Sequence, residues 1–243
     1  MKTLILGDIH GRGIWKHIIE SEEGLDHIIF MGDYFDSFDI PGIDQLHNFN
    51  EIIRFKEETD IKVTMLLGNH DHHYIIPNER YSGFQPSMAW NFVDVLKNNL
   101  HHLQIAYQSD NFIFTHAGIS PIWLDKHIPN WSKSKVIDLL NELYEFQPEK
   151  FNFSTLEYDA YGDSIHQGPL WIRERALMKS NKGDDGFKEN YIQVVGHTHQ
   201  EDIFKSFEAS KKSRGGKYYF VDALESGGYA IIENGSIIPK QYS

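Results

Sequence analysis

The sequence predicts an α/β protein built on a parallel, doubly wound sheet. Between residues 3 and 67, short apolar runs of strand length alternate with segments of helical periodicity. This β-α-β-α-β order is typical of parallel strands joined by right-handed helical crossovers. Four apolar runs in the chain end in glycine followed at once by a polar side chain, which is Asp8, Asp33, Asn69 or His197. Because ligands of open α/β sheets bind beyond the carboxyl ends of the strands, we expect these four tips to converge on one site.

The composition is that of an ordinary soluble globular protein, with 40% hydrophobic and 24% charged residues in a chain of 243. We expect one domain over residues 1–243, with a cap or insertion at about 121–189. There is no apolar run long enough to span a membrane and no signal peptide, which favours a cytoplasmic protein. The absence of cysteine excludes disulfides and thiolate metal ligands. The formal charge of −12 disfavours binding to long nucleic acids.

The first half of the chain is read as strands at about 3–7, 27–31 and 62–67, with helices at 13–23 and 43–58 between them. The second of these helices has four candidate core positions: Leu46, Phe49, Ile53 and Phe55. A further helix is expected at 87–100, where Trp90, Val93 and Leu96 mark the faces.

The sequence pattern then changes to one that predicts antiparallel strands. Residues 103–107 and 112–115 flank a polar turn and predict a hairpin. The aromatic-rich segment that follows contains one clear helix, at 132–144. Short strands are expected at 218–221, 228–233 and 236–240.

The polar tips have the chemistry of a metal site. Asp8 and His10 are two residues apart in an extended segment, so both side chains point to one side and can hold one ion. Hard oxygen donors mixed with imidazoles suit Mn, Fe, Zn or Ni rather than Ca. A carboxylate can also bridge two such ions at the short separation used in phosphate hydrolysis.

Five motifs give the chain a resemblance to the calcineurin-like metallophosphoesterase family. They are Asp-x-His, Gly-Asp-x-x-Asp, Gly-Asn-His-Asp, a lone His after a strand, and Gly-His-x-His, in that order. The resemblance implies a four-layer α/β/β/α sandwich and two divalent metal ions, with Mn expected first and Fe, Zn or Ni as alternatives. Asp33 would bridge the two ions. The implied metal ligands are Asp8, His10, Asp33, Asn69, His116, His197 and His199.

The same resemblance assigns catalytic roles to two residues. His70 would protonate the leaving-group oxygen, and Asp36, which is not expected to be a ligand, would orient it. The nucleophile would be a hydroxide that bridges the two metals. The remaining histidines are read as ordinary surface or core residues, with the first two of this list as the candidates for an exception: His72, His73, His17, His27, His47, His101, His102, His127 and His166.

Within the family, the chain is most similar to bacterial and phage serine/threonine protein phosphatases. Residues 114–121 and 169–175 look like segments of that branch, which places an Arg on the phosphate. Arg173 is the candidate, because a guanidinium fork matches phosphate oxygens. The chain departs from the branch at Ser37, where an Arg that contacts substrate is expected, and Arg12 is the other residue that could supply this charge.

Three functions remain open from the sequence. The first is hydrolysis of phosphate monoesters, carried by phosphoproteins, small molecules or nucleotides. The second is a phosphodiesterase or dinucleoside polyphosphate hydrolase, in which aromatic side chains stack on a base. The candidates for such stacking are Tyr34, Phe35, Phe84 and Trp171. The third is a non-catalytic binding protein on the same fold.

Overall fold

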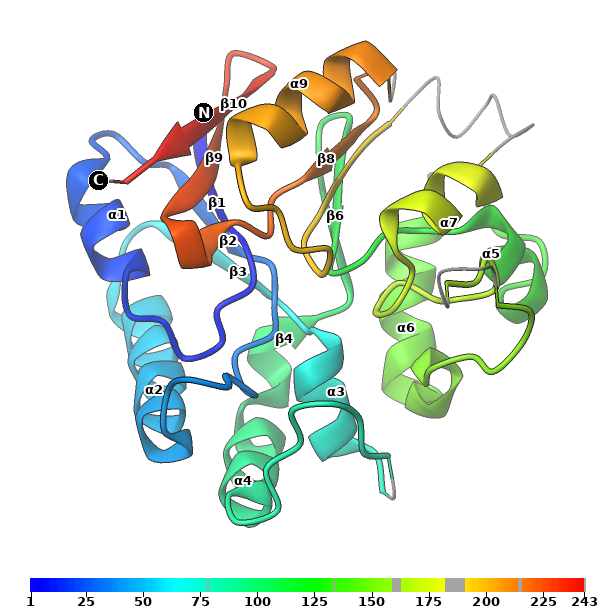
Figure 1. Cartoon of the computed structure of the whole chain (residues 1–243), viewed down its shortest axis with the longest axis horizontal. Coiled ribbons are helices and arrows are strands. Elements are labelled where there is room, and N and C mark those ends of the chain that lie inside the picture. Colours follow the sequence, from blue (N-terminus) through cyan, green and yellow to red (C-terminus); the bar gives the residue numbers. More distant parts are fainter. Residues whose placement is uncertain (78, 133, 159–162, 182–190, 214–215, 243) are drawn as a thin grey trace.

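Two stacked β-sheets with helices outside them form the expected α/β/β/α sandwich (Figure 1). The computed structural model describes residues 1–77, 79–132, 134–158, 163–181, 191–213 and 216–242. The larger sheet has the strand order β10-β9-β1-β2-β3-β4, and the smaller sheet has the order β5-β6-β7-β8. The strands are β1 Lys2–Leu6, β2 His27–Phe30, β3 Lys62–Leu66, β4 Leu103–Gln104, β5 Ala106–Ser109, β6 Phe112–Thr115, β7 Ile192–Val195, β8 Tyr218–Phe220, β9 Gly228–Glu233 and β10 Ser236–Gln241.

The centre of each sheet is parallel, as the alternation of elements predicts. Strands β1, β2 and β3 pair in parallel, with Leu4 beside Ile28 and Ile28 beside Val63. Strands β6, β7 and β8 are likewise parallel. Antiparallel strands border these cores, β9 beside β1 and β5 beside β6. Six strands therefore deliver their carboxyl ends to the same edge of the sandwich.

The alternation of side chains along each strand builds the layers. In β1, Leu4 and Leu6 belong to the core beneath the outer helices, whereas Ile5 belongs to the core between the two sheets. In β6, Phe114 faces the other sheet and Ile113 faces the outer helices. This period of two is what a strand buried on both faces requires.

The helices cover both outer faces of the sandwich (Figure 1). The larger sheet is covered by α1 Trp15–Ser21, α2 Gly42–Glu58 and α4 Ala89–Asn99, and α3 Asn69–Ile75 follows β3. The described part of the 121–189 segment forms α5 Pro121–His127, α6 Val136–Phe146 and α7 Glu174–Ser180 beside the smaller sheet. Helix α9 Ile203–Ser213 packs on β8 and β10. Short 3-10 turns lie at Leu100–His102, Pro148–Phe151 and Leu224–Ser226. The single-domain organisation stays a prediction, and residues 182–190 of the expected cap lie outside the described residues.

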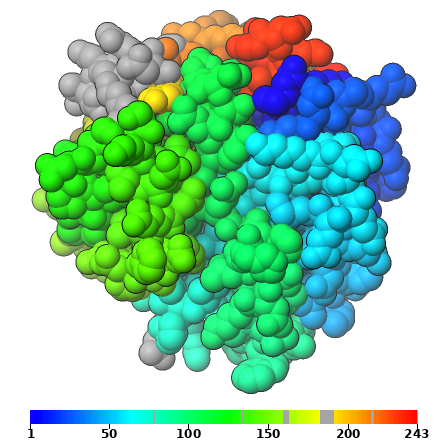
Figure 2. All heavy atoms as spheres, turned by 180° about the vertical axis from the view of Figure 1, so that it is seen from behind, coloured from blue at the N-terminus to red at the C-terminus, as the bar shows by residue number. Residues whose placement is uncertain are grey.

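One expected strand is divided between the two sheets. Residues 103–107 were predicted to form one arm of a hairpin, but β4 pairs in parallel with β3 while β5 pairs antiparallel with β6. The chain changes sheets at Ile105. Asn141 of α6 stabilises this crossing, because its Oδ1 accepts hydrogen bonds from the amides of Ile105 (2.9 Å) and Ala106 (3.0 Å). Seen from behind, the segment that makes this crossing lies between the first third of the chain and the α5–α6 layer (Figure 2).

The helix boundaries agree with the sequence to within a few residues, but one face does not. Of the residues expected to mark the faces of helix α4 (Trp90, Val93 and Leu96 or Lys97), Leu96 is buried and Val93 packs against the core, whereas the Trp90 side chain is 81% exposed; Phe92, which was not singled out, is buried. Of the candidate core positions in α2, Phe49 and Ile53 are buried, whereas Leu46 and Phe55 are partly buried against the same core. Among the described residues, no helix combines the length and apolar character needed to cross a membrane.

Candidate active site

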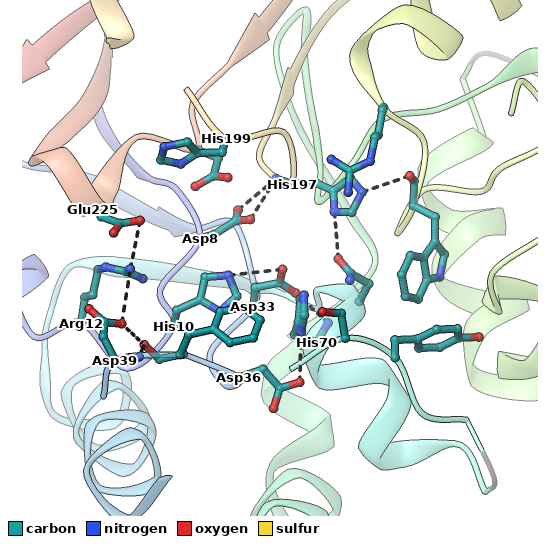
Figure 3. A pocket seen from close by; sticks show the side chains of 18 residues that line it. Asp8, His10, Arg12, Asp33, Asp36, Asp39, His70, His197, His199 and Glu225 are labelled. Atoms are coloured by element: carbon teal, nitrogen blue, oxygen red, sulfur yellow. Dashed lines mark hydrogen bonds and ion pairs between the residues drawn. The ribbon is translucent and has the colours of Figure 1, made fainter. Parts of the chain in front are cut away.

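A cavity of about 620 Å³ opens where the six strand ends meet (Figure 3). It brings together side chains from loops of both sheets that are up to 217 residues apart in the sequence, from Asp8 to Glu225. Its lining includes most of the residues expected from the motifs and several that were not expected: Asp8, His10, Arg12, Asp33, Asp36, Ser37, Asn69, His70, Tyr81, Trp171, Arg173, His197, His199 and Asp222.

The first group of metal-binding side chains consists of Asp8, His10 and Asp33, whose donor atoms lie within 4.8 Å of one another. His10 Nδ1 donates to the carbonyl oxygen of Phe35 at 2.6 Å. This hydrogen bond fixes the ring and leaves Nε2 facing Asp33, with 3.8 Å between Nε2 and Oδ2. Metal-binding histidines are commonly oriented by such a hydrogen bond on the other ring nitrogen.

The second group consists of Asp33, His116 and His197, again within 4.8 Å. His116 Nδ1 contacts the carbonyl of Met31 at 2.9 Å, so Nε2 turns toward the site, 3.3 Å from Asp33 Oδ2. Asn69 Oδ1 lies between the two imidazoles, 2.8 Å from His116 Nε2 and 2.9 Å from His197 Nδ1. Asp33 belongs to both groups, which is the arrangement that a bridging carboxylate needs.

The backbone at this site is held in conformations that side-chain-bearing residues rarely adopt. Four of the candidate residues have positive φ angles, namely His10 (42°), Asp33 (52°), Asp36 (65°) and His197 (60°). Each such residue costs on the order of 1–3 kcal/mol, so surrounding bonds must maintain it. Asp71 provides three of them: Oδ2 accepts from the amides of Asp33 and Gly68 at 2.9 Å, and Oδ1 accepts from Tyr34 at 2.8 Å. The sequence assigned no role to Asp71, the last residue of its motif.

Two glycines allow the carboxylates to approach the loops. A Cβ on Gly68 would lie 2.0 Å from Asp33 Oδ1, and a Cβ on Gly196 would lie 2.2 Å from Asp8 Oδ1. Real Cβ atoms do not approach other atoms so closely. Gly68 and Gly196 are therefore required for steric reasons, because any side chain there would collide with a carboxylate.

The charges and proton affinities of the site fit bound divalent cations. Burial raises the pKa of Asp8 well above its usual range, and the nearby carboxylate of Asp222 raises it further. Burial also lowers the pKa of His10 and His197, which keeps both imidazoles neutral, as metal ligands must be. His116 differs: burial opposes its protonation, but Asp33 and Asp8 raise its pKa to about 10, so this imidazole would release a proton on binding a metal. Burial opposes ionisation of Asp33, yet His116 and His70 hold its pKa well below the usual range. Bound divalent cations would neutralise the carboxylate charge of this buried cluster.

His70 and Asp36 form the expected pair beside these groups. His70 Nδ1 lies 3.0 Å from Asp36 Oδ2, and His70 lines the cavity. Its backbone amide donates to Asp33 Oδ1 at 2.8 Å, which fixes the pair relative to the metal groups.

One of the two histidines named as possible exceptions does contact this pair. His73 is buried, and its Nε2 lies 2.6 Å from Asp36 Oδ2. His72 is ordinary: it is buried, hydrogen-bonded to Tyr144 and Asn152, and burial lowers its pKa to about 4. The contact of His73 with Asp36 follows from helix α3 and has no signature in sequence spacing.

One expected ligand, His199, lies apart from the donor groups, beside a carboxylate that was not expected. His199 lines the cavity but joins neither group, and Figure 3 shows it on the far side of Asp8 from His10. Its charge affects Asp222, a buried carboxylate whose pKa is raised to about 6, chiefly by burial. Sequence reasoning missed Asp222, although it carries the signal of the other tips, a polar residue just after a strand.

Both candidate arginines line the cavity, but their neighbours differ. Arg12 Nη2 is 3.1 Å from Glu225 Oε2 and 3.9 Å from Asp39 Oδ1, so acidic side chains already surround it (Figure 3). Arg173 precedes α7, lines the cavity near His197 and lowers the pKa of that imidazole together with burial. Arg173 is therefore the better placed of the two for a substrate anion.

The aromatic residues considered for stacking on a base differ in whether they line the cavity. Tyr34 and Phe35 are fully buried in the core, so the expectation that they stack on a substrate is wrong. Phe84 packs against that core and does not line the cavity. Trp171 does line it, together with Tyr81, whose ring lies 4.4 Å from that of Trp171.

Two groups of metal-binding side chains that share one carboxylate, at the strand ends of an α/β/β/α sandwich, define the class of metallophosphoesterases. The chain belongs to the calcineurin-like phosphoesterase family, whose model matches residues 1–201. The family is one of phosphoesterases, and it implies a dinuclear centre of divalent metal ions. The roles of individual residues as ligands, acid and phosphate-binding groups stay predictions.

Relatives from several branches resemble the chain. The symmetrical bis(5'-nucleosyl)-tetraphosphatase of Nitrosomonas europaea is 26% identical over 175 residues, which cover 67% of this chain and 58% of that protein. The chain thus matches less than two thirds of that relative's length. A cold-active protein-tyrosine phosphatase of a psychrophilic Shewanella species superposes with a TM-score of 0.64 at 19% identity, covering 99% of this chain and 77% of the other. A protein serine/threonine phosphatase of Saccharomyces cerevisiae gives 0.61 at 12% identity, covering 100% and 79%. The two structures share the fold.

Proposed function

We propose that this protein is a metal-dependent phosphomonoesterase of the phosphatase type, with Mn²⁺ as its working metal. The observation that carries the proposal is the arrangement around Asp33. This carboxylate is common to both donor groups and lies one hydrogen bond from the His70 amide, so metal binding and proton donation meet at one point. When bound, two divalent ions would neutralise phosphate oxygens and lower the pKa of a water molecule that attacks phosphorus.

The ligands would divide between two positions. Asp8 and His10 would serve the first, and Asn69, His116 and His197 the second, with Asp33 shared. His199, which joins neither group, would reach the first position through a change of side-chain conformation. Together these residues fix the phosphorus atom relative to the cavity.

His70 would supply the proton that the leaving group needs. Its Nδ1 is engaged by Asp36, which leaves Nε2 to donate to the leaving-group oxygen. An alkoxide is a poor leaving group, and a positioned acid of this kind contributes about 10²–10⁴-fold to the rate. Arg173, which also lines the cavity, would bind a phosphate oxygen.

The test compares three substrates with the Mn-loaded protein: p-nitrophenyl phosphate, bis-p-nitrophenyl phosphate and glycerol 2-phosphate. A monoesterase hydrolyses the first and third faster than the diester. The variant His70→Asn should keep its metal and lose about 10²-fold or more on glycerol 2-phosphate, with a smaller loss on p-nitrophenyl phosphate. Equal turnover of wild type and variant on the alkyl ester would exclude His70 as the acid.

A second candidate function is hydrolysis of dinucleoside polyphosphates. The similarity to a bis(5'-nucleosyl)-tetraphosphatase and the Trp171–Tyr81 wall, on which a base could stack, support it. Ser37 in place of a phosphate-contacting Arg also suits a substrate other than a dianionic monoester. Release of nucleoside diphosphates from diadenosine tetraphosphate faster than phosphate from p-nitrophenyl phosphate would favour this function. Metal binding without turnover of any of these substrates would favour a non-catalytic role.

A further inference from the structure

The Asp36 carboxylate contacts three polar side chains. Oδ2 lies 3.0 Å from His70 Nδ1 and 2.6 Å from His73 Nε2, and Oδ1 accepts a hydrogen bond from the Tyr74 hydroxyl at 2.5 Å. Asp36 and His73 are both buried. Two imidazoles therefore contact the same carboxylate oxygen. Of the two histidines, only His70 lines the cavity.

The ring of His73 has a defined orientation. Its Nδ1 accepts a hydrogen bond from the amide of Tyr81 at 3.3 Å, so the ring proton is on Nε2, which faces Asp36. The 2.6 Å contact places the Nε2 proton against Asp36 Oδ2. An unprotonated nitrogen could not lie so close to a carboxylate oxygen without repulsion.

His73 also connects Asp36 to the wall of the cavity. Tyr81 lines the cavity, its ring lies parallel to that of His73 with 6.0 Å between centroids, and its other face meets Trp171. The amide that binds His73 belongs to this same residue. The position of Asp36 thus depends, through His73, on Tyr81, a residue that lines the cavity.

We propose that His73 is a positioning residue for proton donation: it holds the Asp36 carboxylate in the place from which Asp36 orients His70. The proposal rests on the proposed function of this site. Tyr74 donates to only one oxygen of Asp36, and the contact with His73 Nε2 is the one that holds Oδ2 beside His70. Removing that contact should weaken the acid and leave the metal groups intact.

Two substitutions separate the two nitrogens of His73. An asparagine amide takes the place of Nδ1, so His73→Asn can still accept the Tyr81 amide but cannot reach Asp36. A glutamine amide extends to the place of Nε2, so His73→Gln can still donate to Asp36. We expect His73→Asn to lose about 10–100-fold in kcat on glycerol 2-phosphate and under about 3-fold on p-nitrophenyl phosphate, with KM and bound metal unchanged. His73→Gln should recover most of the loss.

Two kinetic outcomes would overturn the proposal. One is a folded His73→Asn variant that turns over glycerol 2-phosphate like the wild type, and the other is an equal loss on both esters. A lower content of bound metal in both variants would also overturn it, because Asp36, His70 and His73 could themselves hold an ion.

A spectroscopic measurement on the wild type needs neither turnover nor a folded variant. Two-bond ¹H–¹⁵N correlations in the Mg-loaded protein report the tautomer of each histidine ring. The proposal requires the Nε2–H tautomer for His73, and an Nδ1–H tautomer would exclude it. If no phosphate ester is hydrolysed, the proposed function fails, while this measurement still decides whether His73 donates to Asp36.

Discussion

Gly68 and Gly196 show how closely single residues are fitted to the ligands. Any side chain at either position would overlap a carboxylate oxygen of Asp33 or Asp8. We expect Gly68→Ala to displace Asp33, lowering metal affinity and turnover of p-nitrophenyl phosphate at least about 10-fold. Isothermal titration with Mn²⁺ measures the first effect, and a steady-state assay measures the second.

The matched control is Gly13→Ala. At that position an added Cβ would meet only Asn48 Oδ1, at 3.8 Å, which is an ordinary contact. The control should bind metal like the wild type. If Gly68→Ala also bound metal normally, the close approach of this loop to Asp33 would not matter for the site.

Asp222 is the residue whose role the sequence left unassigned. It lines the cavity, and its charge raises the pKa of Asp8, which shows that the two carboxylates share one electrostatic environment. We expect Asp222→Asn to weaken Mn²⁺ binding about 10-fold while the fold is kept, because one negative charge near the first metal position is lost. An unchanged dissociation constant in the titration would show that Asp222 acts on neither metal.

Single-residue prediction is strongest where a motif encodes a position and weakest where the fold creates a contact. Asp8, Asp33 and His116 each follow a recognisable apolar run, and their side chains lie close together in the fold, while their roles as ligands stay predictions. His73 could not be found in this way, because its contact with Asp36 depends on the turn of α3 and on a loop 37 residues earlier. Tyr34 was misjudged because a residue beside a motif can point into the core as easily as into the cavity.

At the scale of elements, β2 contains a histidine that makes stability depend on pH. His27 is buried, its Nε2 lies 2.9 Å from Thr64 Oγ1 of β3, and burial and two nearby lysines lower its pKa to about 4. In the unfolded chain its pKa returns to about 6.5. Between these two values the unfolded state binds a proton that the folded state does not, so stability falls as the pH falls.

The expected loss is about 2 kcal/mol between pH 6.5 and pH 5. Urea unfolding at the two pH values measures it in the wild type and in His27→Gln, which can still contact Thr64 but cannot take up a proton. The difference between the two pH values should be smaller in the variant by that amount. An identical pH dependence in both proteins would show that His27 is protonated without unfolding.

The elements themselves could be predicted where periodicity is strong and not where the chain changes partners. Strands β1, β2 and β3 and helix α2 have the expected positions because their apolar residues repeat with a clear period. The division between β4 and β5 depends on Asn141 from a helix 36 residues later, and local sequence does not contain that contact. Helix α9 was missed because its buried Ile203 and Phe207 are followed by small polar residues that hide the period.

At the scale of the whole molecule, the buried carboxylates connect metal binding to stability. Asp8 and Asp33 follow strands of the larger sheet and Asp222 follows a strand of the smaller one, so the three carboxylates lie together only in the folded chain. Free Mn²⁺ at 100 times its dissociation constant should therefore stabilise the fold by about 2.7 kcal/mol. Calorimetry with and without a chelator measures this as a rise in Tm, and Asp33→Asn should show a much smaller rise. A wild-type Tm that does not respond to the metal would contradict the proposed centre.

The pairing of β1 with β9 has a consequence for how the protein is made. β1 lies between β2 and β9, and Lys2 pairs with Glu233 at the opposite end of the sequence. A ribosome that adds 5–20 residues per second needs on the order of 10–40 s to reach β9 after it has completed β1. For that time the strand that leads to Asp8 has a free apolar edge, and chaperones or neighbouring nascent chains can bind it. Strand β1 is therefore protected on both edges only after more than 200 further residues have been synthesised.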